Sequence, residues 1–242
     1  MDQVNSQNPE LSLDKLLEEF FNGPQRKRKS MLGKLEILKE EISSRGLDLF
    51  SEQDPDSDNW SVGWLLQLQY RQSKEVNKDD KFREFEGWFN KPSSNGIDYK
   101  TLERKLLIQD YEEADRLTSA YLRELSGNLA VDRGYVYFSE VTNISKVDLT
   151  TIDRLWVAYS QMKFGFSVQS RLLNSLGARY ELLWPKIGWK VNGVWTRYPG
   201  SFTWDIKAPD GHMPLVNQLR GVRLMDTILK HPAIEDRRLN NI

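Results

Sequence analysis

Residues 149–160, LTTIDRLWVAYS, carry the pattern on which the fold prediction rests. Apolar side chains recur there at intervals of three and four residues, which places them on one face of a helix. These side chains are Ile152, Leu155, Trp156 and Tyr159. Thr150 or Thr151 is suited to the N-cap. The stretch therefore predicts a helix that packs one face into the core of the second half of the chain.

Further helices are expected on both sides of this stretch. Their expected spans are 99–106, 111–126, 168–176 and about 215–230. Asp98 and Ser167 are suited to N-caps, and Gly127 is suited to a C-cap. Asn192-Gly193 stands between two short apolar runs, which is the signal of a tight β-hairpin.

The first half of the chain also predicts paired helices. Their apolar faces span residues 12–21, 31–42 and 60–70, and an acidic loop, SEQDPDSDN, precedes the third. Together with the second half, these patterns predict an all-α protein. A small N-terminal helical bundle is followed by a mostly helical core with at most a short β-ribbon.

A domain boundary is predicted near residues 91–96, KPSSNG, because Pro, Ser, Asn and Gly in succession favour a linker. The charge changes sign there. Residues 1–95 hold 14 Lys and Arg against 18 Asp and Glu, for −4, and residues 96–242 hold 20 against 17, for +3. We therefore expect two domains, 1–95 and 96–242.

Composition excludes several classes of site. The chain has no cysteine, and its two histidines are His212 and His231, which rules out disulfides, thiolate catalysis and a multi-histidine metal centre. A net charge of −1 argues against a general nucleic-acid coat. No apolar run approaches 18 residues, and the first residues resemble neither a secretory signal nor a transit peptide, so neither a membrane span nor a targeting segment is expected.

The sequence shows no catalytic constellation. Four carboxylates share one predicted helix but point to different sides of it, which favours a solvated face. They are Asp110, Glu112, Glu113 and Asp115. There is no Gly-x-Ser-x-Gly elbow, phosphate loop or dinucleotide fingerprint. Nothing in these residues therefore requires an enzyme or a catalytic cofactor, and nothing in them excludes an enzyme.

Large aromatic rings are concentrated in one irregular segment. Six of them fall within 21 residues that are also rich in Pro and Gly: Trp184, Trp189, Trp195, Tyr198, Phe202 and Trp204. A short loop cannot bury all of them in the core, so some must face outward or line a cavity. Such rings suit a flat aromatic ligand.

A polar stripe follows this segment. Asn217, Arg220 and Arg223 are three residues apart and share one helix face. The arginines either pair with an internal acid such as Asp205, Asp210 or Asp226, or they hold acidic groups of a ligand. Together with the aromatic loop, the polar stripe indicates a ligand that has a broad apolar face and at least two acidic groups. A tetrapyrrole with two propionates fits, and so does single-stranded nucleic acid, which the net charge disfavours.

Four motifs, in order, resemble the Genomes Uncoupled family of tetrapyrrole-binding proteins. They are LTTIDRLW at 149–156, FGFSVQ at 164–169, IGW at 187–189 and APDGHMP at 208–214. The resemblance covers about residues 97–232. Residues 11–95 more weakly resemble the helical bundle that precedes the core in cyanobacterial members. Residues 144–147 and 161–163 depart from the usual family pattern at two turns.

The resemblance implies a non-catalytic protein that binds protoporphyrin IX and magnesium protoporphyrin IX and stimulates magnesium chelatase in chlorophyll biosynthesis. The large porphyrin-binding subunit of that enzyme would be its partner. It further implies a monomer in a cyanobacterial cytoplasm, at a thylakoid or in a plastid, and leaves peripheral membrane association open. The alternative is an adaptor whose aromatic groove binds a peptide.

The resemblance also implies where the pigment binds. The family core is an all-helical cupped hand with an apolar palm and a mobile finger loop. Arg197 to Trp204 match that loop, so Tyr198, Phe202 and Trp204 are candidate contacts. Phe138 matches a palm position, and Asn217, Arg220 and Arg223 match the polar rim. The helix hairpin 99–126 is assigned mainly to core packing. Because magnesium prefers oxygen ligands, Asn217, or a water that it holds, is preferred over His212 as the axial group.

Overall fold

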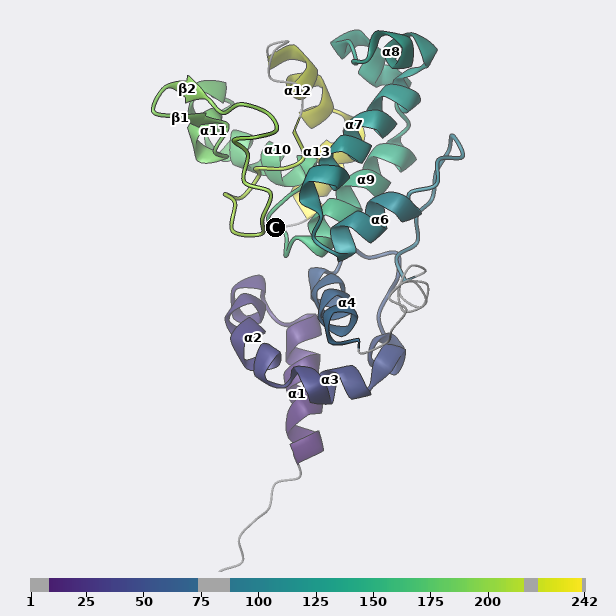
Figure 1. The fold of residues 1–242 in the computed structure, drawn as a ribbon, viewed down its shortest axis with the longest axis vertical. Coiled ribbons are helices and arrows are strands. Elements are labelled where there is room, and N and C mark those ends of the chain that lie inside the picture. Colours follow the sequence, from purple (N-terminus) through teal and green to yellow (C-terminus); the bar gives the residue numbers. More distant parts are fainter. Residues whose placement is uncertain (1–8, 74–87, 216–221, 241–242) are drawn as a thin grey trace, which may run out of the picture.

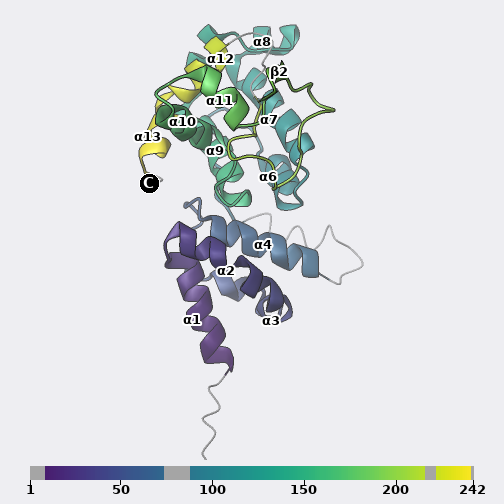
Figure 2. The ribbon, with the colours of Figure 1, turned by 90° about the vertical axis from the view of Figure 1, so that its left-hand side faces the viewer.

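The computed structural model describes residues 9–73, 88–215 and 222–240. The chain forms two lobes, which are separate in both views (Figures 1 and 2). The N-terminal lobe contains α1 (Pro9–Asn22), α2 (Gln25–Ile37), α3 (Lys39–Ser44), the 3-10 helix η1 (Gly46–Phe50) and α4 (Trp60–Gln72). Helix α4 of the N-terminal lobe packs against α6 and α9 of the other lobe.

The C-terminal lobe is helical apart from one short ribbon. Its elements are α6 (Lys100–Leu107), α7 (Tyr111–Ser126), α8 (Asn128–Arg133), η2 (Phe138–Asn143), α9 (Lys146–Tyr159), α10 (Phe166–Ser175), α11 (Tyr180–Lys186), β1 (Lys190–Val191), β2 (Val194–Trp195), α12 (Val222–Leu229) and α13 (Pro232–Asn240). The all-α prediction is therefore confirmed. The predicted hairpin is also present: Lys190 pairs with Trp195, and Asn192 and Gly193 have the positive φ values, 49° and 81°, of a tight turn.

Helix α9 is the centre of this lobe, as the opening sequence pattern predicts. Almost every one of its residues is buried, because α4, α6, α10 and α13 all pack against it. Trp156 is fully buried, and its Nε1 donates a hydrogen bond to Thr118 Oγ1 of α7 at 2.9 Å. The apolar side chains of α9 are thus buried against several helices at once.

The predicted N-caps of α9 and α10 differ from those in the structure. The N-cap of α9 is Ser145, whose hydroxyl accepts from the Asp148 amide at 3.0 Å, and neither predicted threonine caps it. Ser167 lies inside α10, and its amide instead donates to Asp153 Oδ1 of α9 at 2.9 Å. A carboxylate from another helix replaces the local cap there. Pro232 begins a further helix, α13, that the sequence analysis did not predict.

The segment predicted as a linker is held against the core. Ser93 Oγ and Tyr99 Oη donate to Asp148 Oδ1 at 2.5 and 2.8 Å, and the Ser94 amide donates to Oδ2 at 3.1 Å. Asp148 thus fixes the chain between the lobes. The boundary between residues 95 and 96 stays a prediction. No helix in the described part of the chain is long and apolar enough to cross a bilayer.

Candidate functional site

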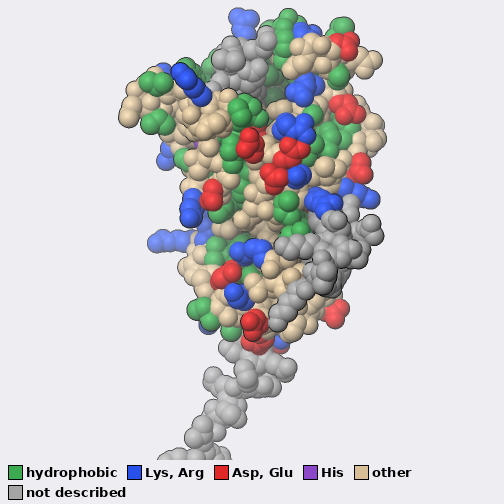
Figure 3. Space-filling model, viewed as in Figure 1, with side chains coloured by type: hydrophobic (Ala, Val, Ile, Leu, Met, Phe, Trp, Pro, Cys, Tyr) green, Lys and Arg blue, Asp and Glu red, His purple; other side chains and the backbone are tan. Residues whose placement is uncertain are grey.

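A cavity of about 640 Å³ opens in the C-terminal lobe between α7, the segment after α8, the hairpin and α12. Its lining residues are Asp115, Arg116, Ser119, Leu122, Arg123, Gly134, Tyr135, Val136, Ile144, Trp195, Thr196, Arg197, Tyr198, Leu215, Leu224 and Ile228. A volume of this size is typical of a small-molecule site. On the face shown in Figure 3, acidic and basic side chains are interspersed among hydrophobic ones.

The deep part of the cavity is apolar. Leu122 of α7 and Ile228 of α12 are buried, and Val136 and Ile144 flank the η2 turn between them. These side chains belong to elements that are far apart in the sequence, and the packing of both α12 and α7 against η2 brings them together. The apolar face of a ligand bound here would be removed from contact with water on several sides.

Two aromatic rings form one wall at the mouth. Trp195 and Tyr198 are 43% and 46% exposed, whereas Trp189 is buried. Trp184 stacks on Trp189 with centroids 5.6 Å apart and also contacts Trp195 at 5.5 Å. The prediction that some of these rings line a cavity is therefore confirmed, and the buried rings support the exposed ones.

Hydrogen bonds hold the loop that carries these rings. Trp189 Nε1 donates to the His212 carbonyl at 2.8 Å, and the Thr196 amide donates to the Trp189 carbonyl at 3.0 Å. His212 is buried between them: its Nε2 accepts from the Thr203 amide at 3.3 Å, and its Nδ1 lies 2.6 Å from the Ile187 carbonyl. Burial lowers the pKa of His212. His212 is therefore a structural residue of the loop.

Two guanidinium groups face the cavity without a bound acid. Arg123 lies on α7 and Arg197 on the loop after β2. Within residues 9–73, 88–215 and 222–240, no carboxylate pairs with either of them. Arg116 differs, because both its Nε and Nη2 bind Glu113, at 2.6 and 2.5 Å. The site thus combines an apolar interior, an aromatic wall and two available cations at its mouth.

Comparison with known proteins assigns the family. A sequence model of the GUN4-like family matches residues 92–232, which is more than half of the chain. The chain belongs to the GUN4-like family. The predicted resemblance is therefore confirmed, and the match includes every residue that lines the cavity.

Individual GUN4-like relatives agree with this assignment. The chain is 50% identical over 147 residues to the Ycf53-like protein of Synechocystis, covering 61% of this chain and 63% of that protein. It is 38% identical over 144 residues to the chloroplastic tetrapyrrole-binding protein of Arabidopsis thaliana, covering 56% and 54%. The matched segment therefore spans less than two thirds of either relative.

The fold of the GUN4-like segment is similar to solved structures. GUN4 from Chlamydomonas reinhardtii superposes with a TM-score of 0.57 at 40% identity, covering 60% of this chain and 93% of that one. Ligand-free GUN4 from Arabidopsis thaliana gives 0.53 at 38% identity, covering 57% and 99%. The similarity thus includes nearly the whole of those two chains.

The candidate residues of this GUN4-like chain fall into four groups. Tyr198 lines the cavity. Phe202 is 8% exposed and stacks on Trp204 at 5.5 Å, and both contact Tyr198 at 5.8 Å, so they pack behind it rather than in the lining. Asn217 and Arg220 lie outside the described residues.

Phe138 and Arg223 are neighbours at the rim. Phe138 is 44% exposed at the start of η2, and the Arg223 guanidinium lies 5.5 Å from the centre of its ring. Neither residue is in the lining. Asp226, one of the acids expected to neutralise the arginines, instead binds Tyr180 Oη and Lys230 Nζ, at 3.0 and 2.9 Å.

The sequence analysis missed the contribution of α7. It assigned the hairpin 99–126 mainly to packing, but one side of α7 forms a wall of the cavity. It also placed Asp115 on a solvated face, whereas Asp115 is 1% exposed. The spacing of Asp115, Ser119 and Arg123, each four residues apart, was the available signal, because it puts a polar line on one helix face.

Proposed function

We propose that this protein binds protoporphyrin IX and magnesium protoporphyrin IX in the cavity, without catalysing a reaction on them, and that it stimulates magnesium chelatase. The observation that carries the proposal is the cavity itself. An interior of leucine, isoleucine and valine under an aromatic wall suits a macrocycle. Arg123 and Arg197 at its mouth, which pair with no carboxylate among the described residues, suit the carboxylates of a ligand.

The energetics favour moderate affinity. If roughly 300 Å² of apolar ligand surface leaves water, the gain is about 7 kcal/mol at about 25 cal/mol per Å². Loss of ligand freedom and ordering of the loop offset part of it. Moderate affinity suits a protein that passes its pigment to a partner, and the name of the Arabidopsis relative supports the ligand class.

The proposed contacts divide by chemistry. Tyr198 and Trp195 would pack against the macrocycle, with Phe202 and Trp204 supporting Tyr198. Phe138 would extend the apolar rim. Asn217, Arg220 and Arg223 are proposed as polar contacts because of the family resemblance, and Arg123 and Arg197 because of the structure. We propose that the protein acts as a monomer in a cyanobacterium or a plastid, where its relatives occur.

Porphyrin titration tests the binding proposal. Protoporphyrin IX or deuteroporphyrin added to the protein is expected to show a shifted Soret band and to quench tryptophan fluorescence, because Trp184 and Trp195 lie at the site. Absence of both signals at micromolar protein would reject it. Binding of an aromatic peptide instead would favour the adaptor alternative.

The chelatase proposal needs a separate assay. Purified magnesium chelatase is expected to insert magnesium faster at limiting porphyrin when this protein is added. A matched reaction with heat-denatured protein is the control. An unchanged rate, in a protein that does bind porphyrin, would restrict the function to pigment binding.

A further inference from the structure

Asp115 is a buried carboxyl group in the wall of the cavity. It is 1% exposed and lines the cavity from α7. Oδ1 accepts a hydrogen bond from the Leu215 amide at 2.6 Å, whereas Oδ2 has no hydrogen-bond partner in the described part of the chain. A buried acceptor without a partner is costly, so a donor from whatever occupies the cavity would stabilise it.

The surroundings compensate the charge of Asp115 only in part. Arg116, the next residue on α7, is held by Glu113, and Glu112 adds a further negative charge. The Tyr198 hydroxyl approaches the carboxylate from the loop without reaching hydrogen-bond geometry. Burial raises the pKa of Asp115 to about 7, although the Leu215 amide and Tyr198 counteract it. Above that pH the group is a carboxylate to which no described residue donates a hydrogen bond at Oδ2.

We propose that Asp115 contacts the bound pigment and accepts a hydrogen bond from a water molecule on its central magnesium ion. This inference rests on the proposed porphyrin binding. The ring N–H groups of a metal-free porphyrin lie in the macrocycle plane, where a carboxylate at its face cannot reach them well. Magnesium prefers oxygen ligands and retains water, and such a water projects from the face with polarised protons.

Asp115 would therefore distinguish magnesium porphyrins from metal-free ones. The hydrogen bond exists only when the central ion carries an axial water, so it adds to the affinity for one ligand and not for the other. The propionate contacts at the mouth serve both ligands equally. The two parts of the site thus have separate roles. The contacts at the mouth recognise the propionates of any such porphyrin, and Asp115 recognises the magnesium ion.

Asp115→Asn is the informative variant. The Leu215 amide holds Oδ1, so the side-chain nitrogen of the new asparagine takes the place of Oδ2. The substitution therefore replaces a hydrogen-bond acceptor with a donor and keeps the shape of the side chain. Its affinity is measured at pH 8 for magnesium, nickel(II) and metal-free deuteroporphyrin. Nickel(II) is a control of equal charge, because it favours square-planar coordination without an axial water.

We expect the substitution to weaken binding of the magnesium porphyrin about tenfold and to leave the other two within about twofold. Equal weakening of all three, or no change for the magnesium porphyrin, would overturn the inference. The readout is the ratio of magnesium to nickel affinities, which stays informative if the substitution also alters the cavity. Asp115→Ala, which adds no donor, should change that ratio in the same direction.

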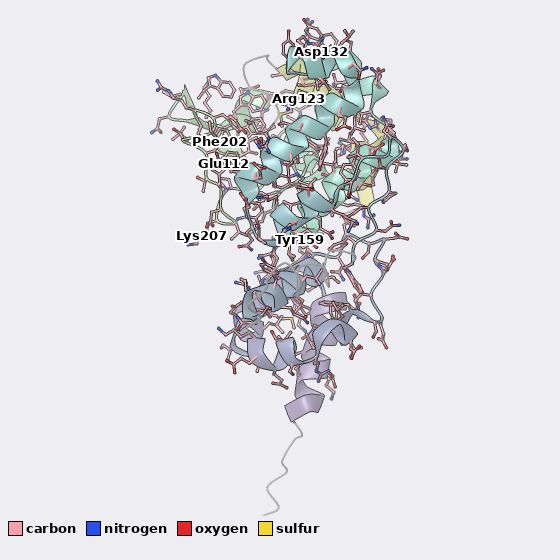
Figure 4. The ribbon with its side chains drawn as sticks, turned by 45° about the vertical axis from the view of Figure 1, so that its right-hand side comes forward. Glu112, Arg123, Asp132, Tyr159, Phe202 and Lys207 are labelled. Carbon is pink, nitrogen blue, oxygen red and sulfur yellow. The ribbon has the colours of Figure 1, made fainter. Side chains whose placement is uncertain are left out.

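Glu112→Gln is the matched control, since it removes the same charge from a residue three positions before Asp115 on α7 that does not line the cavity. Glu112 is exposed and is not in the lining, and Figure 4 shows it towards the start of α7, well before Arg123. The ratio of its affinities for the magnesium and nickel porphyrins should equal that of the wild type. If wild-type protein binds none of the three porphyrins, the proposed function itself fails, which differs from the outcome that overturns the role of Asp115.

Discussion

At the scale of single residues, Asp115 and its neighbours show how similar side chains take different roles on one helix. Asp110 caps α7, and Glu113 is neutralised by Arg116 at the surface. Asp115 is turned inward, because the i+4 spacing to Ser119 puts it on the cavity side. Sequence spacing therefore separates the faces, but it does not show which face is covered.

The pH dependence of stability should report the burial of Asp115. Its folded pKa of about 7 lies above the ordinary value of 3.8, so the native state binds more protons than the unfolded state between these values. The free energy of unfolding therefore falls as pH rises from about 4 to about 7, by on the order of 4 kcal/mol for this group. Asp115→Asn does not titrate.

Urea unfolding at pH 4.5 and pH 8 measures this difference. Relative to wild type, Asp115→Asn is expected to be more stable at pH 8 than at pH 4.5, because only the wild type must keep a buried charge. Comparing the two proteins cancels the titration of all other groups. An identical stability difference at both pH values would contradict the buried position of the carboxyl group.

The two available arginines should recognise the ligand carboxylates. We expect Arg123→Gln and Arg197→Gln each to weaken deuteroporphyrin binding by about threefold to tenfold, since each removes a charge-assisted hydrogen bond at a partly solvated position. The dimethyl ester of the same porphyrin should bind both variants as it binds the wild type. Fluorescence quenching gives both affinities.

Arg26→Gln is a suitable control, because Arg26 is exposed on α2 in the other lobe. Its porphyrin affinity should not change. If the acid and the ester lose affinity equally in the cavity variants, the arginines shape the mouth but do not bind propionates.

At the scale of the elements, the contact of α4 with α9 depends on one glycine. A Cβ atom built on Gly63 would lie 2.3 Å from the Ala158 carbonyl oxygen, and a backbone atom cannot move aside as a side chain can. Gln67, one turn further along α4, donates from Nε2 to the carbonyls of Leu106 and Tyr159, both at 3.0 Å. The helices thus approach closely enough for a side chain to bind the ends of two helices in the other lobe.

Gly63→Ala should therefore destabilise the protein by about 1–3 kcal/mol, measured by urea unfolding, because the helices must separate to admit a methyl group. Gly33→Ala in α2 is the matched control, since nothing lies within 4 Å of its Cβ position. There the change should stabilise by about 0.5–1 kcal/mol through helix propensity. A neutral result for Gly63→Ala would mean that α4 and α9 are not in tight contact.

At the scale of the whole molecule, buried arginines tie the two lobes together. Arg237 of α13 donates to Asp153 Oδ2 of α9 and to Asp58 Oδ2 of the acidic loop, both at 2.6 Å. Arg154 donates to the carbonyls of Pro55 and Ser57, at 3.0 and 3.1 Å. The acidic loop is therefore a docking segment for the C-terminal lobe.

Arg237→Met should lower the free energy of unfolding by about 3 kcal/mol, because it leaves the fully buried Asp153 without its cation. Lys146→Met, which removes only the exposed ion pair with Asp236, should cost less than about 1 kcal/mol. Buried tryptophans in both lobes, Trp60 and Trp156, report unfolding by fluorescence. Equal stabilities of the two variants would show that the buried triad does not hold the lobes.

Periodicity in the sequence was enough to predict the fold class and most helices, and the Asn192-Gly193 turn was enough to predict the hairpin. Local patterns of this kind act over three or four residues, so they can be read without knowing the neighbours. The same reasoning predicted that aromatic rings after residue 184 line a cavity, as Trp195 and Tyr198 do. Family motifs, which are also local, indicated the tetrapyrrole ligand class.

Only tertiary packing decided which surfaces close on one another. The cap of α10 comes from Asp153 on a different helix, and the cavity joins α7, η2, the hairpin loop and α12. Asp115 is buried because the Leu215 segment, 100 residues away, covers it. Desolvation depends on every atom around a group, whatever its distance along the chain. For this reason the spacing could place Asp115 on a polar helix face, but it could not show that its carboxyl group is buried.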